Sequence, residues 1–152
     1  MAGAIAMVLS STIANVSVPT VMGAFGVGQD QAQWLATGFV AMMVASQLLS
    51  AWFVSAFGVR GAFVVINCVF FAGTALIFLG TSFEIVVLGR VLQGFSAGVV
   101  MPMVMALTVS QFPPHRRGMA MAIYGTGIQI APMIGPMIGG LVIDTLGWRE
   151  IF

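Results

Sequence analysis

The sequence has no lysine, one cysteine, one histidine and charged residues at only 6% of its 152 positions. Its net charge of +1, with no run of like charges, leaves no basic surface, which excludes nucleic-acid binding. Cys68 and His115 have no second cysteine or histidine with which to form a disulfide or a metal site, so neither a metal nor a cofactor is expected. Cys68 lies in an apolar run, which predicts a small buried side chain, and His115 is expected to be solvated in a loop.

Residue sets typical of enzymes are also missing. The sequence has no paired carboxylates, no nucleophile beside a base and no glycine-rich phosphate loop after a strand. Its glycines lie within long apolar runs instead. We therefore do not expect an enzyme.

Apolar residues are abundant: 60% of the residues are hydrophobic, and the mean hydropathy is +1.10. This composition is typical of an integral membrane protein rather than a soluble domain. A helix needs about 20 apolar residues to cross the hydrocarbon layer. Such stretches predict an all-α membrane protein with about five transmembrane helices, at 5–21, 34–54, 62–79, 84–110 and 119–143. The short connector at 55–61 predicts that the second and third spans are antiparallel neighbours.

The fourth predicted span contains a charge, Arg90, six residues from its start. An arginine at the centre of a membrane helix is unfavourable by about 2.5–3.5 kcal/mol, so it is expected to face a bundle interior or an aqueous cavity. Gln93, and Asn15 in the first span, could orient Arg90 or contact a substrate. The alternative is structural: Arg90 pairs inside the bundle or snorkels, and the polar residues of the first span only bond neighbouring helices.

The fifth predicted span is rich in glycine and proline. Small residues recur every four positions along it: Gly127, Ala131, Gly135 and Gly139. Such a row lets another helix approach closely, whereas prolines at 132 and 136 each remove a backbone hydrogen bond and favour local bends. The sequence therefore predicts a hinge or seal between two helical units. The alternative is a non-transporting assembly or regulatory subunit that packs this face on a partner.

The arginines predict an orientation in the membrane. With five spans, the connectors that carry Arg60 and Arg116–Arg117 lie on one side, and Arg149 lies on the other. Because cytoplasmic loops carry an excess of basic residues, the first side and the N-terminus are expected to be cytoplasmic.

Several stretches, in this order along the chain, resemble motifs of the major facilitator superfamily, in particular its fourteen-span drug:proton antiporter branch. They are 9–19, 33–37, 88–98, 112–118 and 127–140, with the ending 147–152. The stretch 88–98 is similar to the fourth-helix motif through Arg90, Gln93 and Gly94. The stretch 127–140 resembles the fifth-helix antiporter motif through Gly127, with Gly135-Pro136 and Gly139-Gly140.

The resemblance implies a bundle of inverted three-helix repeats and transport of a small-molecule substrate by alternating access. It also implies efflux of drug-like compounds, the proton as the coupling ion and a location in the bacterial cytoplasmic (inner) membrane. Five spans make one repeat and two thirds of the next. The chain is therefore expected to be the N-terminal part of a transporter and to pair with a C-terminal remainder.

Two positions depart from the family's pattern. The first-helix signature carries an aspartate, used for proton or cation coupling, where this sequence has Ser10. The cytoplasmic loop motif between the second and third spans keeps only Gly58 and Arg60. The resemblance thus implies a weaker charge clamp at that loop.

Overall fold

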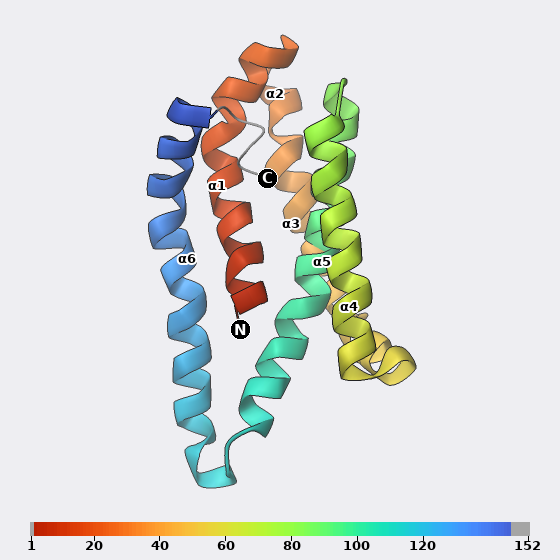
Figure 1. Ribbon diagram of the computed structural model, residues 1–152, viewed down its shortest axis with the longest axis vertical. Coiled ribbons are helices and arrows are strands. Elements are labelled where there is room, and N and C mark those ends of the chain that lie inside the picture. Colours follow the sequence, from red (N-terminus) through yellow and green to blue (C-terminus); the bar gives the residue numbers. More distant parts are fainter. Residues whose placement is uncertain (1, 147–152) are drawn as a thin grey trace.

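The computed structural model describes the backbone of residues 2–146 and the side chains of all of these except 2–6, 10, 13–16, 131, 143, 144 and 146. All regular secondary structure in this part of the chain is helical, as predicted. Its elements are α1 (Ala2–Phe25), α2 (Gln29–Ala32), α3 (Trp34–Gln47), α4 (Ser50–Leu79), α5 (Phe83–Ser110), the 3-10 turn η1 (Pro114–Arg116) and α6 (Arg117–Leu146). The long helices run alternately up and down the long axis of the molecule (Figure 1).

Within the described residues, three helical stretches are long and apolar enough to cross a membrane by length and composition: Ser50–Leu79, Phe83–Ser110 and Pro114–Val142. The fourth and fifth predicted spans lie within α5 and α6. At 1.5 Å per residue, the 14 residues of α3 extend about 21 Å, less than the hydrocarbon thickness of about 30 Å. Membrane crossing by α1 and α3 stays a prediction.

The second predicted span, 34–54, is not one helix in the structure. α3 ends at Gln47, and α4 begins at Ser50 and bends at Gly58. The apolar residues after Gln47 form a separate helical segment before the bend, in which the ring of Phe53 lies 5.9 Å from the ring of Phe95 on α5. The predicted connector 55–61 is therefore a bend inside α4 rather than a loop.

Gly58 makes this bend possible. Its φ of 67° and ψ of 167° fall in a region of backbone space that is essentially restricted to glycine. We expect Gly58→Ala to destabilise the protein by about 1–3 kcal/mol, because alanine is strained in this backbone conformation. Nothing lies within 4 Å of the new Cβ, so the substitution introduces backbone strain without a steric clash.

Thermal unfolding of the purified protein in detergent measures this effect. Gly23→Ala in α1 is the matched control, because that site also has open space around it but no positive φ. An alanine there should raise stability by about 0.5–1 kcal/mol. Equal unfolding temperatures for the two variants would contradict the assigned backbone strain.

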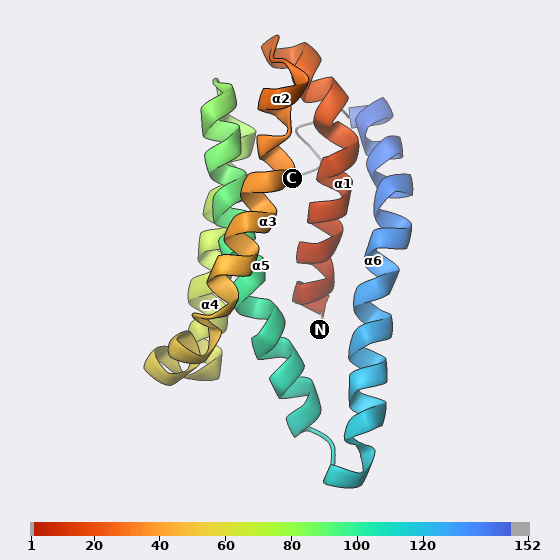
Figure 2. The same ribbon diagram turned by 180° about the vertical axis from the view of Figure 1, so that it is seen from behind.

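α5 is the central helix of the bundle. α3 and α4 each pack mainly on α5, whereas α1 packs mainly on α6 (Figures 1 and 2). The prediction that the second and third spans are neighbours is wrong: α3 and α4 run antiparallel, but their backbones hardly approach each other, and each packs on α5 instead. The bundle thus consists of a three-helix group, α3–α5–α4, and a pair, α1–α6.

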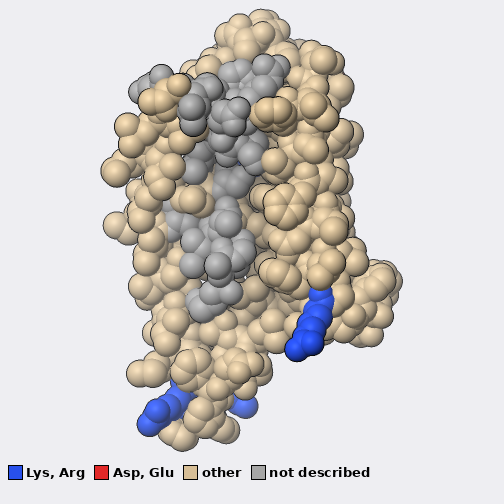
Figure 3. All heavy atoms as spheres, viewed as in Figure 1, with Lys and Arg blue, Asp and Glu red and all other residues tan. Residues whose placement is uncertain are grey.

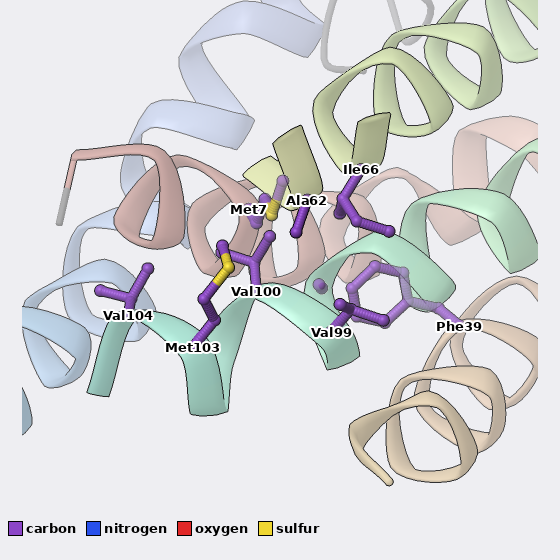
Figure 4. Close-up of a cluster of buried hydrophobic side chains, with 9 residues drawn as sticks. Met7, Phe39, Ala62, Ile66, Val99, Val100, Met103 and Val104 are labelled. Atoms are coloured by element: carbon purple, nitrogen blue, oxygen red, sulfur yellow. The ribbon is translucent and has the colours of Figure 1, made fainter. Parts of the chain in front are cut away.

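The main apolar core lies where α1, α3 and α4 meet α5 (Figure 4). Its buried members are Met7, Phe39, Ala62, Ile66, Ala97, Val99, Val100, Met103 and Val104. Cys68 does not belong to it: the prediction of a buried thiol is wrong, since the side chain is exposed on α4. Much of the remaining surface of α4 is equally apolar, with exposed Val64, Phe71 and Leu79.

Glycines bring α5 very close to both of its partners. A Cβ built on Gly89 would lie 2.6 Å from the carbonyl oxygen of Gly73 on α4. A Cβ on Gly94 would overlap the backbone carbonyl of Phe39 on α3. Such close backbone approach is typical of helix packing in membranes, where small residues line the interfaces.

Candidate functional site

Arg90 is buried in the interior of the bundle, with 1% of its surface exposed. Its Nη1 donates a hydrogen bond of 2.9 Å to Oε1 of Gln93, one helical turn further along α5. Its Nε donates to the backbone carbonyl of Leu35 on α3 at 3.3 Å. The guanidinium carbon of Arg90 lies 4.3 Å from the ring centroid of Phe39, which is also on α3, and forms a cation–π contact with that ring.

Gln93 extends this network to α4. Its side chain is fully buried, and its Nε2 donates to Oγ1 of Thr74 at 2.9 Å. A buried polar group left without a partner is unfavourable by about 1–3 kcal/mol. The hydrogen bonds to Arg90 and Thr74 therefore stabilise the buried carboxamide of Gln93. Hydrogen bonds therefore join α3, α5 and α4 in sequence from Leu35 through Arg90 and Gln93 to Thr74.

One side of the network borders a cavity of about 210 Å³ between α1, α3 and α5. Its lining residues are Val8, Ser11, Ala36, Phe39, Val40, Met43, Arg90 and Met101. The cavity is smaller than the roughly 300–1,000 Å³ of sites that enclose a drug-sized ligand, so it can take part of such a molecule.

A second cavity, of about 490 Å³, lies near the bend of α4 and the end of α5. Its lining is mostly apolar: Gln47, Leu48, Ser50, Ala51, Val54, Val59, Pro102, Met103, Ala106, Leu107 and Ser110. Arg90 and Gln93 are not among these residues.

The structure thus brings together two of the three predicted polar residues, Arg90 and Gln93. Asn15 lies in α1, but its side chain falls outside the described residues, as does that of Ser10. The sequence did not indicate Thr74, Phe39 or the Leu35 carbonyl. Thr74 is a polar residue in an otherwise apolar stretch, which was the only available signal for it.

The glycine and proline residues of the fifth predicted span lie in α6, which packs on α1. Gly135 and Gly139 are buried, Gly127 and Gly140 are partly buried, and Pro136 is exposed. Gly135 and Gly139 therefore lie away from the exposed surface, whereas Pro136 faces outward. α6 is a single helix from Arg117 to Leu146, so Pro132 and Pro136 do not interrupt it.

α6 also bonds to the central helix. The hydroxyl of Tyr124 donates to the carbonyl of Met101 at 3.0 Å, next to Pro102 of α5. This contact links the α1–α6 pair to the three-helix group.

Exposed arginines gather at one end of the molecule. Arg60 is exposed just after the bend at Gly58, and Arg116 and Arg117 lie at the turn before α6. Figure 3 shows basic side chains at this lower end of the visible face. Asp30 on α2 and Glu84 at the start of α5 lie at the opposite end (Figure 1). This charge distribution agrees with the predicted grouping of arginines on one side.

Comparison with known proteins identifies the architecture. The family model of the Major Facilitator Superfamily matches residues 1–152. The multidrug export protein EmrB of Haemophilus influenzae is 37% identical over 145 residues, which cover 95% of this chain and 28% of that protein. The uncharacterized MFS-type transporter YhcA of Bacillus subtilis is 35% identical over 152 residues, 100% of this chain and 29% of that protein. The fatty acid resistance protein FarB of Neisseria gonorrhoeae is 31% identical over 145 residues, 95% of this chain and 29% of that protein.

The chain thus spans less than a third of the length of these relatives. The match over every residue confirms the resemblance stated from the motifs, and it agrees with the apolar helices and the buried arginine of α5. It also fits the expectation that the protein is not an enzyme. The chain is a multi-pass membrane protein that belongs to the Major Facilitator Superfamily of transporters.

Proposed function

We propose that this chain forms the N-terminal part of a secondary active transporter that exports drug-like or other small molecules by alternating access. The single observation that carries the proposal is Arg90, which is buried, held by Gln93 and beside a cavity between three helices. The similarity to the multidrug export protein EmrB and to the fatty acid resistance protein FarB supports small-molecule efflux.

In this mechanism Arg90 acts as a fixed positive charge at the wall of the transport path. It attracts an anionic group of the substrate, a water chain or a carboxylate from the C-terminal remainder of the transporter. Electrostatic attraction is stronger at this buried site than in water, because the effective dielectric constant is lower. Asn15 of α1 is proposed to contact the substrate or to orient Arg90 from the other side of the cavity.

The two helical groups supply the moving parts. Alternating access in such folds is largely a rocking of helix units around a fixed site. In this chain the α3–α5–α4 group carries Arg90, and α1, which packs mainly on α6, lines the other side of the cavity. The row of small residues on α6 is proposed to act as the hinge or seal.

We further propose that the protein lies in the bacterial cytoplasmic membrane with its N-terminus in the cytoplasm. The arginine-rich end of the bundle supports this orientation. The proton is the proposed coupling ion, with its carboxylate supplied elsewhere than at position 10, where the sequence has serine.

Flux into liposomes tests the proposed function. A polypeptide of transporter length that contains this chain is reconstituted, and accumulation of a fluorescent lipophilic cation is followed after a pH gradient is imposed. We expect accumulation that disappears when an ionophore removes the gradient. Gradient-independent accumulation would contradict proton coupling, and the absence of any flux would contradict the transport function.

The α6 proposal predicts a leak. Gly135 is buried, so Gly135→Leu should force α6 away from its neighbours and raise proton leak several-fold, with little change in substrate KM. Pro136→Ala should alter the leak or coupling in the same selective way. The leak is measured with a pH-sensitive dye inside the liposomes.

Gly125→Leu is the control for that experiment, because Gly125 is on the same helix with open space around it. It should leave the leak unchanged. A change in KM alone for Gly135→Leu would argue against a hinge or seal.

A further inference from the structure

We propose that Thr74 of α4 is a positioning residue that fixes the orientation of the Gln93 carboxamide and, through it, that of the Arg90 guanidinium. Thr74 lies outside every stretch that resembles a family motif. Its role in transport rests on the function proposed above. Its role in holding Arg90 rests on the hydrogen bonds alone.

The chemistry of the three side chains determines which way the amide points. A guanidinium carries donors only, so Gln93 must present its oxygen to Arg90. The NH₂ group then points away from Arg90 and needs an acceptor of its own. The hydroxyl of Thr74 accepts that hydrogen bond at 2.9 Å.

Without the threonine hydroxyl, the NH₂ group of Gln93 loses its acceptor, and the hydrogen bond that anchors the carboxamide to α4 is lost. A carboxamide turned by 180° would place its NH₂ group against the guanidinium, donor facing donor. In that orientation Gln93 could no longer accept the hydrogen bond from Nη1 of Arg90. Arg90 would sample other positions, including positions reaching further into the adjacent cavity.

The packing of α4 on α5 explains how so short a side chain reaches Gln93. Gly73 precedes Thr74, and a Cβ built on it would lie 2.7 Å from the carbonyl oxygen of Gly89 and 3.2 Å from the backbone nitrogen of Gln93. The two backbones therefore nearly touch one residue before Thr74. A larger residue at 73 would move the hydroxyl out of reach.

Chemical modification of arginine tests the proposal without requiring transport. The protein in liposomes is treated with phenylglyoxal, and modification of each arginine is followed by mass spectrometry of its peptides. Thr74→Val keeps the shape of the side chain and removes the acceptor, whereas Thr74→Ser keeps the hydroxyl. We expect Arg90 to react at least about 5-fold faster in Thr74→Val and at the wild-type rate in Thr74→Ser.

Two controls separate positioning from general loosening of the fold. The exposed Arg60, Arg116 and Arg117 should react at unchanged rates in every variant. In a Gln93→Leu background, Thr74→Val should add nothing, because the amide through which it acts is absent. Thr74→Ala is measured beside Thr74→Val so that the outcome does not depend on a single variant.

The proposal is overturned if Arg90 reacts at the wild-type rate in Thr74→Val and Thr74→Ala, or if the effect of Thr74→Val persists in the Gln93→Leu background. In the transport assay, Thr74→Val should lower kcat more than it changes KM, and Thr74→Ser should restore kcat. Faster modification of Arg90 without any transport in the wild type would support the positioning role and contradict only the proposed function.

Discussion

Arg90→Ala is expected to lower the rate of export by about 100-fold in a transporter that contains this chain. Hydrogen bonds to a charged group contribute about 1.5–3 kcal/mol, and every 1.4 kcal/mol corresponds to a factor of ten. The substitution removes the positive charge beside the cavity and leaves the buried Oε1 of Gln93 without its donor. The initial rate of substrate efflux from reconstituted liposomes measures the effect.

Two matched variants accompany this experiment. Arg90→Lys keeps the charge but cannot bond both Gln93 and the Leu35 carbonyl in the same fork geometry, so activity should stay low. Arg60→Ala removes an exposed charge at the end of the bundle and should change transport far less. If the Arg90→Ala variant exports substrate at the wild-type rate, Arg90 has a structural role only and the proposed role in transport is wrong.

Gly94→Val is expected to destabilise the protein by at least about 3 kcal/mol. Its Cβ would overlap the backbone carbonyl of Phe39, and a backbone cannot move aside as the end of a flexible side chain can. α3 would have to separate from α5, which would also break the bond between Leu35 and Arg90. The fraction of protein that stays monodisperse after heating in detergent measures the loss.

The same substitution at Gly125 is the control. A Cβ at that position of α6 would have nothing within 4 Å, so Gly125→Val should be close to neutral. Comparable losses for the two variants would contradict the close contact between α5 and α3.

Much of the fold could be predicted from hydropathy, because long apolar runs have few alternatives to a helix in a membrane. Lateral neighbours could not be predicted this way. A short connector fixes the direction of the next helix but not what it packs against, and the contact between Gly73 and Gly89 places α4 on α5 instead of α3. The bend at Gly58 was missed because an apolar count does not distinguish one span from two helical segments.

Burial was predictable for charged residues only. Arg90 had to be inside, because exposure to lipid is so unfavourable, and its spacing of three residues from Gln93 placed both on one face of the helix. Cys68 shows the opposite case: in a membrane protein the outer surface is as apolar as the core, so an apolar context does not predict burial. Thr74 and Phe39 were not predictable, because their roles depend on contacts between helices that are distant in sequence.

α6 illustrates a further limit of sequence patterns. Pro132 and Pro136 each remove a backbone hydrogen bond, yet the helix continues through both. Neighbouring helices and small local adjustments can satisfy the freed carbonyls in a membrane helix. Proline therefore did not end the helix, and the predicted local bends stay a prediction.

Thiol labelling of Arg90→Cys in a Cys68→Ser background tests most directly whether position 90 faces an internal aqueous path. The variant is reconstituted in liposomes and treated in parallel with a charged, water-soluble methanethiosulfonate and with a lipid-soluble maleimide. The exposed Cys68 of the parent protein serves as the reference for a thiol on the outer surface of the bundle. We expect the water-soluble reagent to modify the cysteine at position 90 through the cavity between α1, α3 and α5. Modification by the lipid-soluble reagent alone would contradict that expectation.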